Sequence, residues 1–228
     1  MIEIVKGEVE KLLGGDKTGH ADDHAIRVHQ ISADFCKAEK ADREIVALAA
    51  LLHDVDDYKI FGRESEENLT NAKKIMAVAD VPAEKQAAVL DIIKNMGYSK
   101  SLSGIRPTTI EGKIVSDADM LEAMGASVIV RCIPNYARDK FIFDKDIRPK
   151  PDMTPEEYKA SSTQRGGFIN HFFEKLLKLK GMMLTESGKK EAAARHDFMV
   201  EFLRAYFREN NLADWSEYLE NYLKGEMK

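Results

Sequence analysis

Apolar residues recur at helical spacing along most of the chain. In three segments they fall at positions i, i+3, i+4 and i+7, which places them on one face of an α-helix. The three sets are Ile45, Leu48, Ala49 and Leu52; Ile169, Phe172, Phe173 and Leu176; and Met199, Phe202, Leu203 and Tyr206. No window of four or more residues alternates convincingly between apolar and polar, and no Asn-Gly or Asp-Gly hairpin turn occurs. The pattern predicts an all-α protein with one buried stripe on each of these helices.

Glycine and proline mark where the predicted helices begin and end. Gly14 and Gly15 end a short first helix, and Gly62 predicts a loop. Pro82 suits a first helical turn, and Gly97 follows the helix that begins there. Two further helices are predicted over about 21–36 and 42–52, and the second ends at the pair His53-Asp54.

A strong helix start lies in the second half of the chain, after a long irregular segment. Thr154 can cap the helix, Pro155 suits its first position, and Glu157 completes a capping box. The preceding segment, 139–152, is predicted to be a long loop that could cover a pocket.

Composition and charge exclude several classes of function. The chain has 228 residues, of which 44% are hydrophobic and 32% charged, and its formal net charge is -5. That charge argues against binding a nucleic acid polymer or an anionic membrane, which requires a basic face. No segment approaches the roughly 18 apolar residues of a membrane span. The first eleven residues lack the apolar core of a signal peptide. We therefore expect a cytoplasmic protein.

The two cysteines agree with that expectation. Cys36 and Cys132 are far apart, and neither belongs to a CxxC pair. Two cysteines cannot form a structural zinc site by themselves, and free cysteines are usual in a reducing compartment. No disulfide framework is predicted.

The chain contains two His-Asp pairs, and their contexts differ. His53-Asp54 directly follows the apolar run 46–52, so it is expected where a buried helix reaches the end of the core. Charged groups in that position are costly unless a partner such as a metal ion compensates them. His196-Asp197 lies in a charged helical run and is expected to be a surface or packing pair.

Other candidate metal ligands lie on both sides of His53-Asp54. His24 precedes the pair by 29 residues, and the acidic segment Ser116-Asp117-Ala-Asp119 follows an apolar pair at 114–115. Spacing alone does not choose between Asp117 and Asp119, since residues two apart on a helix face different ways. Imidazole and carboxylate together suit one divalent ion, namely Mn²⁺, Fe²⁺, Ni²⁺, Co²⁺ or Mg²⁺, with Zn²⁺ as an alternative. Ligands from several helices can meet at one point of a bundle.

These motifs together resemble a known family. The order HxxRV, ALLHD and DAD, which begins at His24, Ala50 and Asp117, is similar to the HD superfamily of metal-dependent phosphohydrolases. The segments that begin at His171 and Ala194 also resemble the C-terminal helices of one bacterial and archaeal subgroup, some of whose members are nucleotide pyrophosphohydrolases. The resemblance implies a single HD domain over residues 1–228, with a metal-binding core at about 20–125 and additional C-terminal helices at about 126–228.

The resemblance also implies which residues hold the metal. His24, His53, Asp54 and Asp119 match the four ligands of the superfamily, which selects Asp119 over Asp117. Three positions depart from the pattern of close relatives: Met120 stands where many carry Arg, Glu122 where they carry Asp, and Met96 where they often carry His. A second metal held by the segment around Met96 is therefore not expected, and the substrate preference of those relatives does not transfer directly.

The expected reaction is hydrolysis of a phosphate ester or anhydride. Asp54 and Asp57 are assigned to catalysis, with Asp57 as the residue that moves a proton, because it follows Asp54 by three positions and matches an acidic catalytic residue of several relatives. An alternative is that Asp57 is a solvated carboxylate at a helix end. Lys59 could bind a phosphate of the substrate.

Two further cations are candidates for substrate binding. Arg27 follows His24 by three residues and should point to the same side, where a guanidinium suits bidentate phosphate binding. Its alternative role is a salt bridge to a ligand carboxylate. Lys175 shares a helix face with His171 and could also reach the substrate, or could be a packing or surface residue.

Three functions remain open at this point. The leading one is a phosphohydrolase of nucleoside triphosphates, and the second is a phosphatase of nucleoside monophosphates or of a nucleotide alarmone. The third belongs to another class, a regulatory or interaction domain in which the metal only braces helices. The aromatic residues Trp215, Tyr218 and Tyr222 could pack on the domain or on a second copy, so a homodimer is also open.

Overall fold

Helices make up the regular structure throughout the described part of the chain. The computed structural model describes residues 1–14, 22–131, 143–154, 157 and 167–225, and none of these is in a β-strand. The all-α prediction is therefore confirmed.

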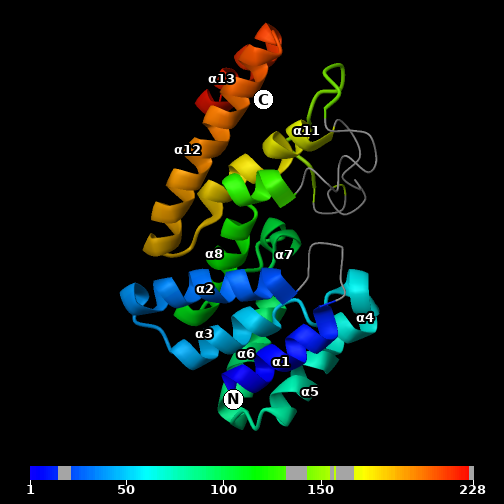
Figure 1. Ribbon diagram of the computed structural model, residues 1–228, viewed down its shortest axis with the longest axis vertical. Helices are drawn as coiled ribbons and strands as arrows, with labels where there is room; N and C mark the ends of the chain where they lie inside the picture. The colour runs from blue at the N-terminus through cyan, green and yellow to red at the C-terminus, as the bar shows by residue number, and fades with distance from the viewer. Residues whose placement is uncertain (15–21, 132–142, 155–156, 158–166, 226–228) are drawn as a thin grey trace.

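From α2 to α8 the helices follow one another with short connections (Figure 1). The first eight are α1 (Ile2–Leu13), α2 (Asp22–Glu39), α3 (Arg43–Leu52), α4 (Tyr58–Asn68), α5 (Thr70–Val78), α6 (Ala83–Asn95), α7 (Tyr98–Leu102) and α8 (Ile110–Glu122). After them come α11 (Gly167–Glu174), the 3-10 helix η1 (Leu176–Met182), α12 (Glu186–Glu209) and α13 (Ala213–Lys224). The bounds of α2 and α3 are close to the predicted ranges of about 21–36 and 42–52. α2 extends three residues beyond Cys36, and Asp42 is the N-cap of α3.

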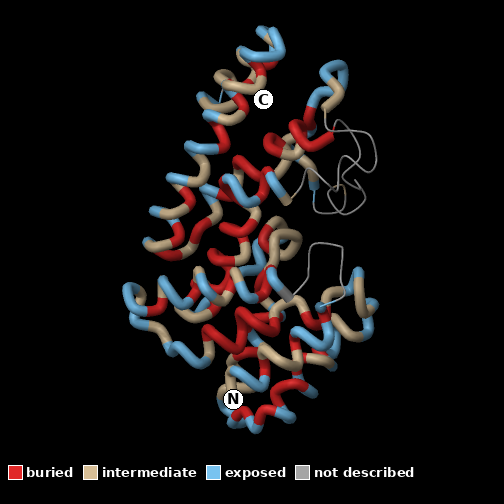
Figure 2. Tube along the Cα trace, viewed as in Figure 1, coloured by how far each residue is buried: buried red, intermediate tan, exposed pale blue. Residues whose placement is uncertain are grey.

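α3 is the central helix of the N-terminal half. It packs against α1, α2, α6 and α8, and every residue of 46–52 is buried. The prediction of one buried stripe on this helix was therefore wrong, because neighbours cover it on several sides (Figure 2). A helix that is apolar all round is a core helix. The His53-Asp54 pair follows directly from this buried segment.

The core consists of two hydrophobic clusters that meet within α8. The first contains buried residues from Val5 to Ala118, and the second contains buried residues from Met120 to Leu219. Met96 is packed in the first cluster. α8 therefore faces both parts of the molecule, and α12 packs against it from the C-terminal side. The expected division into a core at about 20–125 and a part at about 126–228 stays a prediction.

Several local predictions can be compared with the structure. The capping box is present, since Glu157 N donates to Thr154 Oγ1 and Thr154 N donates to Glu157 Oε2. Pro155 lies outside the described residues, as does the part of the predicted loop before residue 143. Gly62 does not form a loop between helices but interrupts α4 with a positive φ of 82°. Pro82 is the N-cap of α6 rather than a residue of its first turn.

The aromatic residues of the C-terminal part pack within this chain. Trp215 is fully buried, and its Nε1 donates to the carbonyl oxygen of Lys145. Tyr218 and Tyr222 each pack edge-on against Phe173. Among the aromatic residues at helical spacing in α12, Phe202 and Tyr206 pack against the core, whereas Phe198 is exposed.

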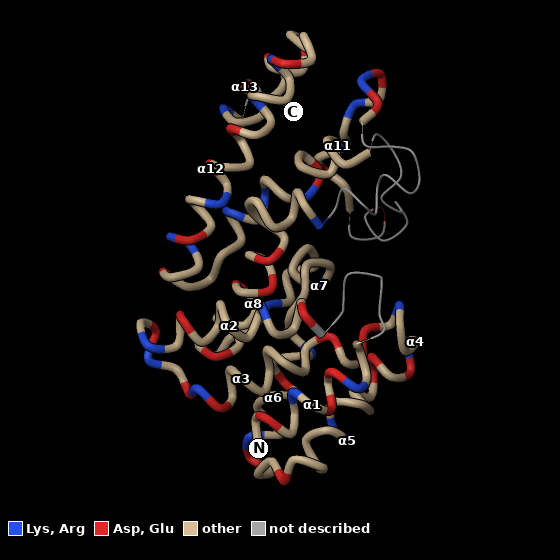
Figure 3. The backbone as a smooth tube through the Cα atoms, viewed as in Figure 1, with Lys and Arg blue, Asp and Glu red and all other residues tan. Residues whose placement is uncertain are grey.

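The charged residues are spread over the described helices. Lys and Arg are interspersed with Asp and Glu along the trace in Figure 3. No helix in the described ranges is both long enough and apolar enough to cross a membrane.

Candidate metal centre

Four predicted ligands come together where α2, α3 and α8 meet. His24 lies in the first turn of α2, His53 is the C-cap of α3, Asp54 follows it, and Asp119 lies on α8. α2 and α3 pack against each other and both pack against α8. The fold therefore brings together residues that are up to 95 positions apart in the sequence.

The ligand atoms converge closely. His53 Nε2 lies 3.2 Å from His24 Nε2 and 3.4 Å from Asp54 Oδ2. Asp119 Oδ1 lies 3.4 Å from His24 Nε2 and 3.8 Å from His53 Nε2. The ligand atoms of His24, His53 and Asp119 all lie within 4.8 Å of one another. Two imidazoles and two carboxylates thus face a common point.

Neighbouring groups hold each imidazole with its Nε2 toward that point. His53 Nδ1 lies 2.8 Å from the carbonyl oxygen of Ala50, to which it can donate. His24 Nδ1 lies 3.6 Å from a carboxylate oxygen of Glu122, which is itself buried. A carbonyl or carboxylate behind the second ring nitrogen is the usual arrangement for metal-binding histidines, since it fixes the tautomer and the ring orientation.

The electrostatic environment of His24 favours a cation. Burial alone lowers its pKa, but the hydrogen bonds to Asp119 and Glu122 and the charge of Asp54 outweigh burial and raise the pKa to about 9. Burial likewise acts to raise the pKa of Asp119, and the interactions with His24 and His53 lower it overall. These carboxylates therefore require positive charge at their common point.

This donor set fits one divalent metal ion. Nitrogen and oxygen ligands in a mixed His-carboxylate set suit the first-row divalent ions and Zn²⁺. The two Nε2 atoms of His24 and His53 lie 3.2 Å apart and face the carboxylates of Asp54 and Asp119. When both rings are neutral and protonated at Nδ1, all four groups are acceptors. A cation at their centre satisfies all four, whereas hydrogen bonds among them satisfy only some.

Asp57 and Lys59 lie just beyond the cluster in the chain. Asp57 is the N-cap of α4, and its Oδ1 accepts a hydrogen bond from Lys59 N at 2.8 Å. It is joined to Asp54 by a tight turn, since Asp57 N donates to the carbonyl oxygen of Asp54. The Lys59 side chain is exposed, with its Nζ 5.9 Å from the ring centroid of Tyr58. The structure therefore shows a capping role for Asp57 and does not test its catalytic one.

Arg27 lies beside the cluster and is engaged by two carboxylates. Its Nε donates to Glu122 at 2.6 Å, and its Nη1 donates to Asp23 at 2.6 Å. Arg27 thus forms salt bridges, but with Glu122 and Asp23 rather than with a ligand carboxylate, which was its alternative role.

The Lys175 side chain contacts α7. Its Nζ is 4.9 Å from the ring centroid of Tyr98. Burial and the charge of Lys175 lower the pKa of His171 to about 3, so His171 is neutral.

Two other buried carboxylates near the cluster in sequence have structural roles. Asp117 accepts hydrogen bonds from Leu184 N, Thr185 N and Thr185 Oγ1, at 2.7–2.8 Å, and so joins α8 to the start of α12. Asp56 accepts from Ser65 Oγ and from two backbone N–H groups in the first turn of α5, those of Asn71 and Ala72. Both are satisfied by neutral donors, as buried carboxylates at helix starts commonly are.

The sequence did not reveal the importance of Glu122 and Arg131. Glu122 appeared only as a departure from the pattern of relatives, yet its buried carboxylate contacts His24, Arg27 and Arg131. Arg131 lies in the helical residues 126–131 and reaches back to donate from Nη2 to the carbonyl oxygen of Glu122 at 2.9 Å. An isolated arginine after an apolar run carries no recognisable signal, so only the fold identifies it.

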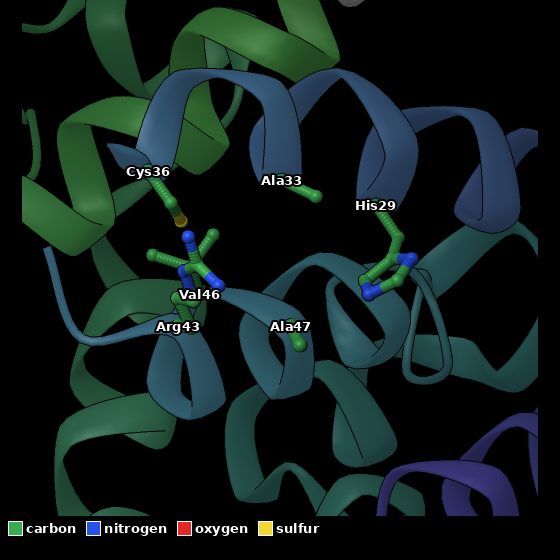
Figure 4. A pocket seen from close by; sticks show the side chains of 6 residues that line it. All are labelled: His29, Ala33, Cys36, Arg43, Val46 and Ala47. Carbon is green, nitrogen blue, oxygen red and sulfur yellow. The ribbon is translucent and has the colours of Figure 1, made fainter. Parts of the chain in front are cut away.

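A cavity of about 320 Å³ lies between α2 and α3 (Figure 4). Its lining residues are His29, Ala33, Cys36, Arg43, Val46 and Ala47. In Figure 4, the Cys36 sulfur points toward Arg43, and His29 lies at the other end. None of the predicted site residues lines this cavity, so it is separate from the metal centre.

Comparison with known proteins agrees with the fold. The HD domain family model matches residues 21–124, which include all four predicted ligands. YpgQ of Bacillus subtilis is 31% identical over 203 residues, which span 89% of this chain and 90% of YpgQ. The chain belongs to the HD superfamily.

Solved structures of similar proteins extend over nearly the whole chain. An HD-superfamily hydrolase from Bacillus thuringiensis is 32% identical, with a TM-score of 0.70 over 92% of this chain and 96% of its own. A Lactobacillus plantarum protein is 33% identical, with a TM-score of 0.77 over 92% of this chain and 96% of its own. YpgQ in complex with ADP is 28% identical in the structural alignment, with a TM-score of 0.66 over 92% of this chain and 97% of its own.

Proposed function

We propose that this protein is a metal-dependent phosphohydrolase that cleaves a phosphate ester or anhydride of a nucleotide. The observation that carries the proposal is the convergence of His24, His53, Asp54 and Asp119 on one point. These four side chains would hold one divalent ion. When bound, such an ion supplies Lewis-acid chemistry, since it polarises a phosphoryl oxygen and lowers the pKa of water.

The chain's own residues would position the reacting groups. The carbonyl of Ala50 and the carboxylate of Glu122 hold the two imidazoles in fixed orientations, which reduces the reorganisation that the reaction requires. Asp54 would act at the reacting centre as a ligand. Asp57 would hold or accept the proton that the attacking water loses, because a tight turn joins it to Asp54.

The nucleotide class of substrate is supported by a relative. YpgQ, which resembles this chain over nearly its full length, has been crystallised with ADP. Nucleoside triphosphates are the leading substrates, with monophosphates or an alarmone as the alternative. Arg27, Lys59 and Lys175 are the cations proposed to contact substrate phosphates, and Arg27 is the one that lies beside the cluster.

The test is a panel assay. Phosphate and pyrophosphate release would be measured from nucleoside mono-, di- and triphosphates, with Mn²⁺ added and with metal removed, for the wild type and for Asp54→Ala. Release that depends on metal and is lost in the variant supports a hydrolase, and the product names the bond that is cleaved. A metal-loaded protein that melts at a higher temperature but releases nothing supports the metal-braced regulatory domain.

A pair of variants separates the two roles of Asp57. Asparagine caps helices about as well as aspartate, so Asp57→Asn should retain stability while kcat falls by about 10²- to 10⁴-fold, the usual range for a general acid or base. Asp57→Ala removes the cap as well and should lose about 1 kcal/mol of stability in addition. Full activity in Asp57→Asn would leave Asp57 with its capping role alone.

A further inference from the structure

The cavity between α2 and α3 is lined by side chains that the proposed reaction does not use. Its lining residues are His29, Ala33 and Cys36 from α2, and Arg43, Val46 and Ala47 from α3. Each set lies on one face of its helix, because its members are three, four or seven residues apart. From His29 to Cys36 the helix rises by about 10 Å, at about 1.5 Å per residue. The volume of about 320 Å³ lies at the lower end of the range for ligand pockets, so the cavity can hold one small molecule.

Arg43 is the cation of this cavity. In Figure 4 the Cys36 sulfur points toward it. Burial raises the pKa of the Cys36 thiol, and the charge of Arg43 acts in the opposite direction. Within the described part of the chain, the Arg43 guanidinium makes no hydrogen bond and no ion pair. A guanidinium has five N–H donors, and those of Arg43 are therefore available to a ligand.

The acidic groups closest to Arg43 in the fold have other partners. Asp42 caps α3, where its Oδ1 accepts from two backbone N–H groups, and its Oδ2 lies 3.8 Å from Lys85 Nζ. Glu111 Oε1 accepts a hydrogen bond from Asp42 N at 3.0 Å. Both carboxylates are thus engaged away from the cavity. The cavity keeps one positive charge that no ion pair among the described residues balances.

The remaining lining divides into an apolar middle and a polar far end. Ala33, Val46 and Ala47 supply small apolar side chains. His29 lies at the end opposite Arg43 (Figure 4). Burial and the charge of Lys6 lower the pKa of His29 below 6.5, so its ring is neutral at pH 7 and can both donate and accept a hydrogen bond. Ala33 and Arg43 are exposed, which leaves a route into the cavity from solvent.

We propose that this cavity is a binding site for a small organic carboxylate and that it is separate from the metal centre. The carboxylate pairs with Arg43, and the apolar body of the ligand lies against Ala33 and Ala47. A polar group at the far end of the ligand reaches His29. A single guanidinium balances one negative charge, and its planar fork matches the two oxygens of a carboxylate. The proposal is independent of the phosphohydrolase function, because none of the lining residues is assigned to that reaction.

The experiment locates the binding of a probe of this class by NMR. The Mg²⁺-loaded, isotope-labelled full chain is titrated with para-hydroxybenzoate. Two comparison probes are titrated in the same way: para-hydroxybenzamide has nearly the same shape without the charge, and acetate has the charge without the ring. The shifts of the backbone amides report where each probe binds and how tightly. The titrations are repeated after removal of the metal.

Two pairs of variants separate the cavity from other sites. Arg43→Gln removes the charge, and its control is Arg208→Gln, because Arg208 is an arginine in the last turn of α12. Ala33→Leu fills the cavity, and its control is Ala38→Leu, since Ala38 is an exposed residue of α2 outside the lining. Alanine and leucine both favour helices, so the last two variants should keep the fold. The melting temperature of each variant checks this.

The expected result is binding of para-hydroxybenzoate that shifts the amides of α2 and α3 around the cavity. The affinity should exceed that for either comparison probe by about tenfold or more, since one lacks the charge-assisted hydrogen bonds and the other lacks the apolar body. Arg43→Gln should weaken binding by about 10- to 100-fold, and Ala33→Leu should abolish it. Both controls and metal removal should leave the affinity almost unchanged.

Three results would overturn the assignment. The first is the absence of shifts along α2 and α3 at saturating para-hydroxybenzoate. The second is equal affinity for the carboxylate and the amide, or an unchanged affinity in Arg43→Gln, since either shows that the charge has no role. The third is binding that disappears with the metal and survives Ala33→Leu, which would place the probe on the metal centre.

Discussion

Asp117 and Asp119 lie two residues apart on α8, and their carboxylates serve opposite sides of that helix. Asp117 is fully buried and accepts hydrogen bonds from Leu184 and Thr185 at the start of α12. Asp119 retains 26% exposure and faces His24 and His53 on α2 and α3. One side of α8 thus joins the two halves of the molecule, and the other side forms the candidate metal centre.

The two carboxylates differ in what compensates their charge. Burial raises the pKa of Asp117, and three hydrogen bonds from neutral groups of Thr185 and Leu184 partly offset that effect. Asp119 has the imidazoles of His24 and His53 as partners, and their interactions lower its pKa. The nearby carboxylate of Asp54 acts in the opposite direction. Hydrogen bonds from neutral donors that satisfy a buried carboxylate indicate a structural role, whereas a carboxylate that faces two imidazoles and a second carboxylate fits a cation-binding site. The comparison predicts that substitutions on the two sides of α8 have separable effects.

The largest expected effect is on activity at Asp119. Asp119→Asn keeps the shape of the side chain but removes a ligand and a negative charge, so metal-dependent turnover should fall by at least about 10³-fold. The melting temperature of the metal-free protein at neutral pH should also fall, because the interactions with His24 and His53 that lower the pKa of Asp119 are lost with its charge. Turnover assays and metal analysis on the purified variant measure both. An active variant with a full complement of metal would show that Asp119 is not a ligand.

The second effect is on stability at Asp117. Asp117→Ala leaves the N–H groups of Leu184 and Thr185 and the hydroxyl of Thr185 without their acceptor. The free energy of unfolding should fall by about 3 kcal/mol or more, at 1–3 kcal/mol for each buried unsatisfied group. Urea denaturation gives this value, and kcat of the folded fraction below the transition should stay within about threefold of the wild type. Loss of activity without loss of stability would reverse the roles assigned to the two residues.

A smaller effect is expected at Gly188, which packs against Asp117. A Cβ atom at this position would lie 2.2 Å from Asp117 Oδ2, so the junction would have to move. Gly188→Ala should lower the free energy of unfolding by about 1–3 kcal/mol, the usual cost of overpacking. Gly181→Ala is the matched control, because a Cβ there meets nothing within 4 Å. Thermal melting of the two variants checks the prediction, which equal melting temperatures would contradict.

The metal-free cluster should also depend on pH. The folded-state pKa of His24 is raised from 6.5 to about 9, although burial acts to lower it. The proton on His24 therefore stabilises the metal-free fold fully below pH 6.5, and this stabilisation is lost as the pH rises to about 9.

Metal binding must displace this proton below pH 9. The apparent affinity for Mn²⁺ should therefore rise by about tenfold per pH unit, or 1.4 kcal/mol, until it levels near pH 9. Titration of metal-free protein at several pH values measures the slope, and a flat profile between pH 6.5 and pH 9 would show that no ligand carries a proton in the metal-free state.

The sequence predicted the class of fold from local patterns. Helical periodicity needs only neighbours within about two turns, which is why the bounds of α3 and the capping box at Thr154 were predictable. The order of His24, His53-Asp54 and the DAD segment also predicted the residues that come together. The burial of α3 on several sides and the exposure of Phe198 were not predictable, because they depend on which helices pack around each position.

The sequence by itself determined that the chain is all-helical, which follows from the spacing of its apolar residues. It also determined which four side chains are candidates to bind a metal, which the resemblance to the HD superfamily implies. Only the tertiary structure decided what their neighbours do. In the folded chain Asp117 accepts a hydrogen bond from Thr185, Arg27 donates to the Glu122 carboxylate, and Arg131 donates to the Glu122 carbonyl at the edge of the cluster. These contacts join residues 9 to 95 positions apart, and such pairings are set by the packing of whole helices, which no local pattern records.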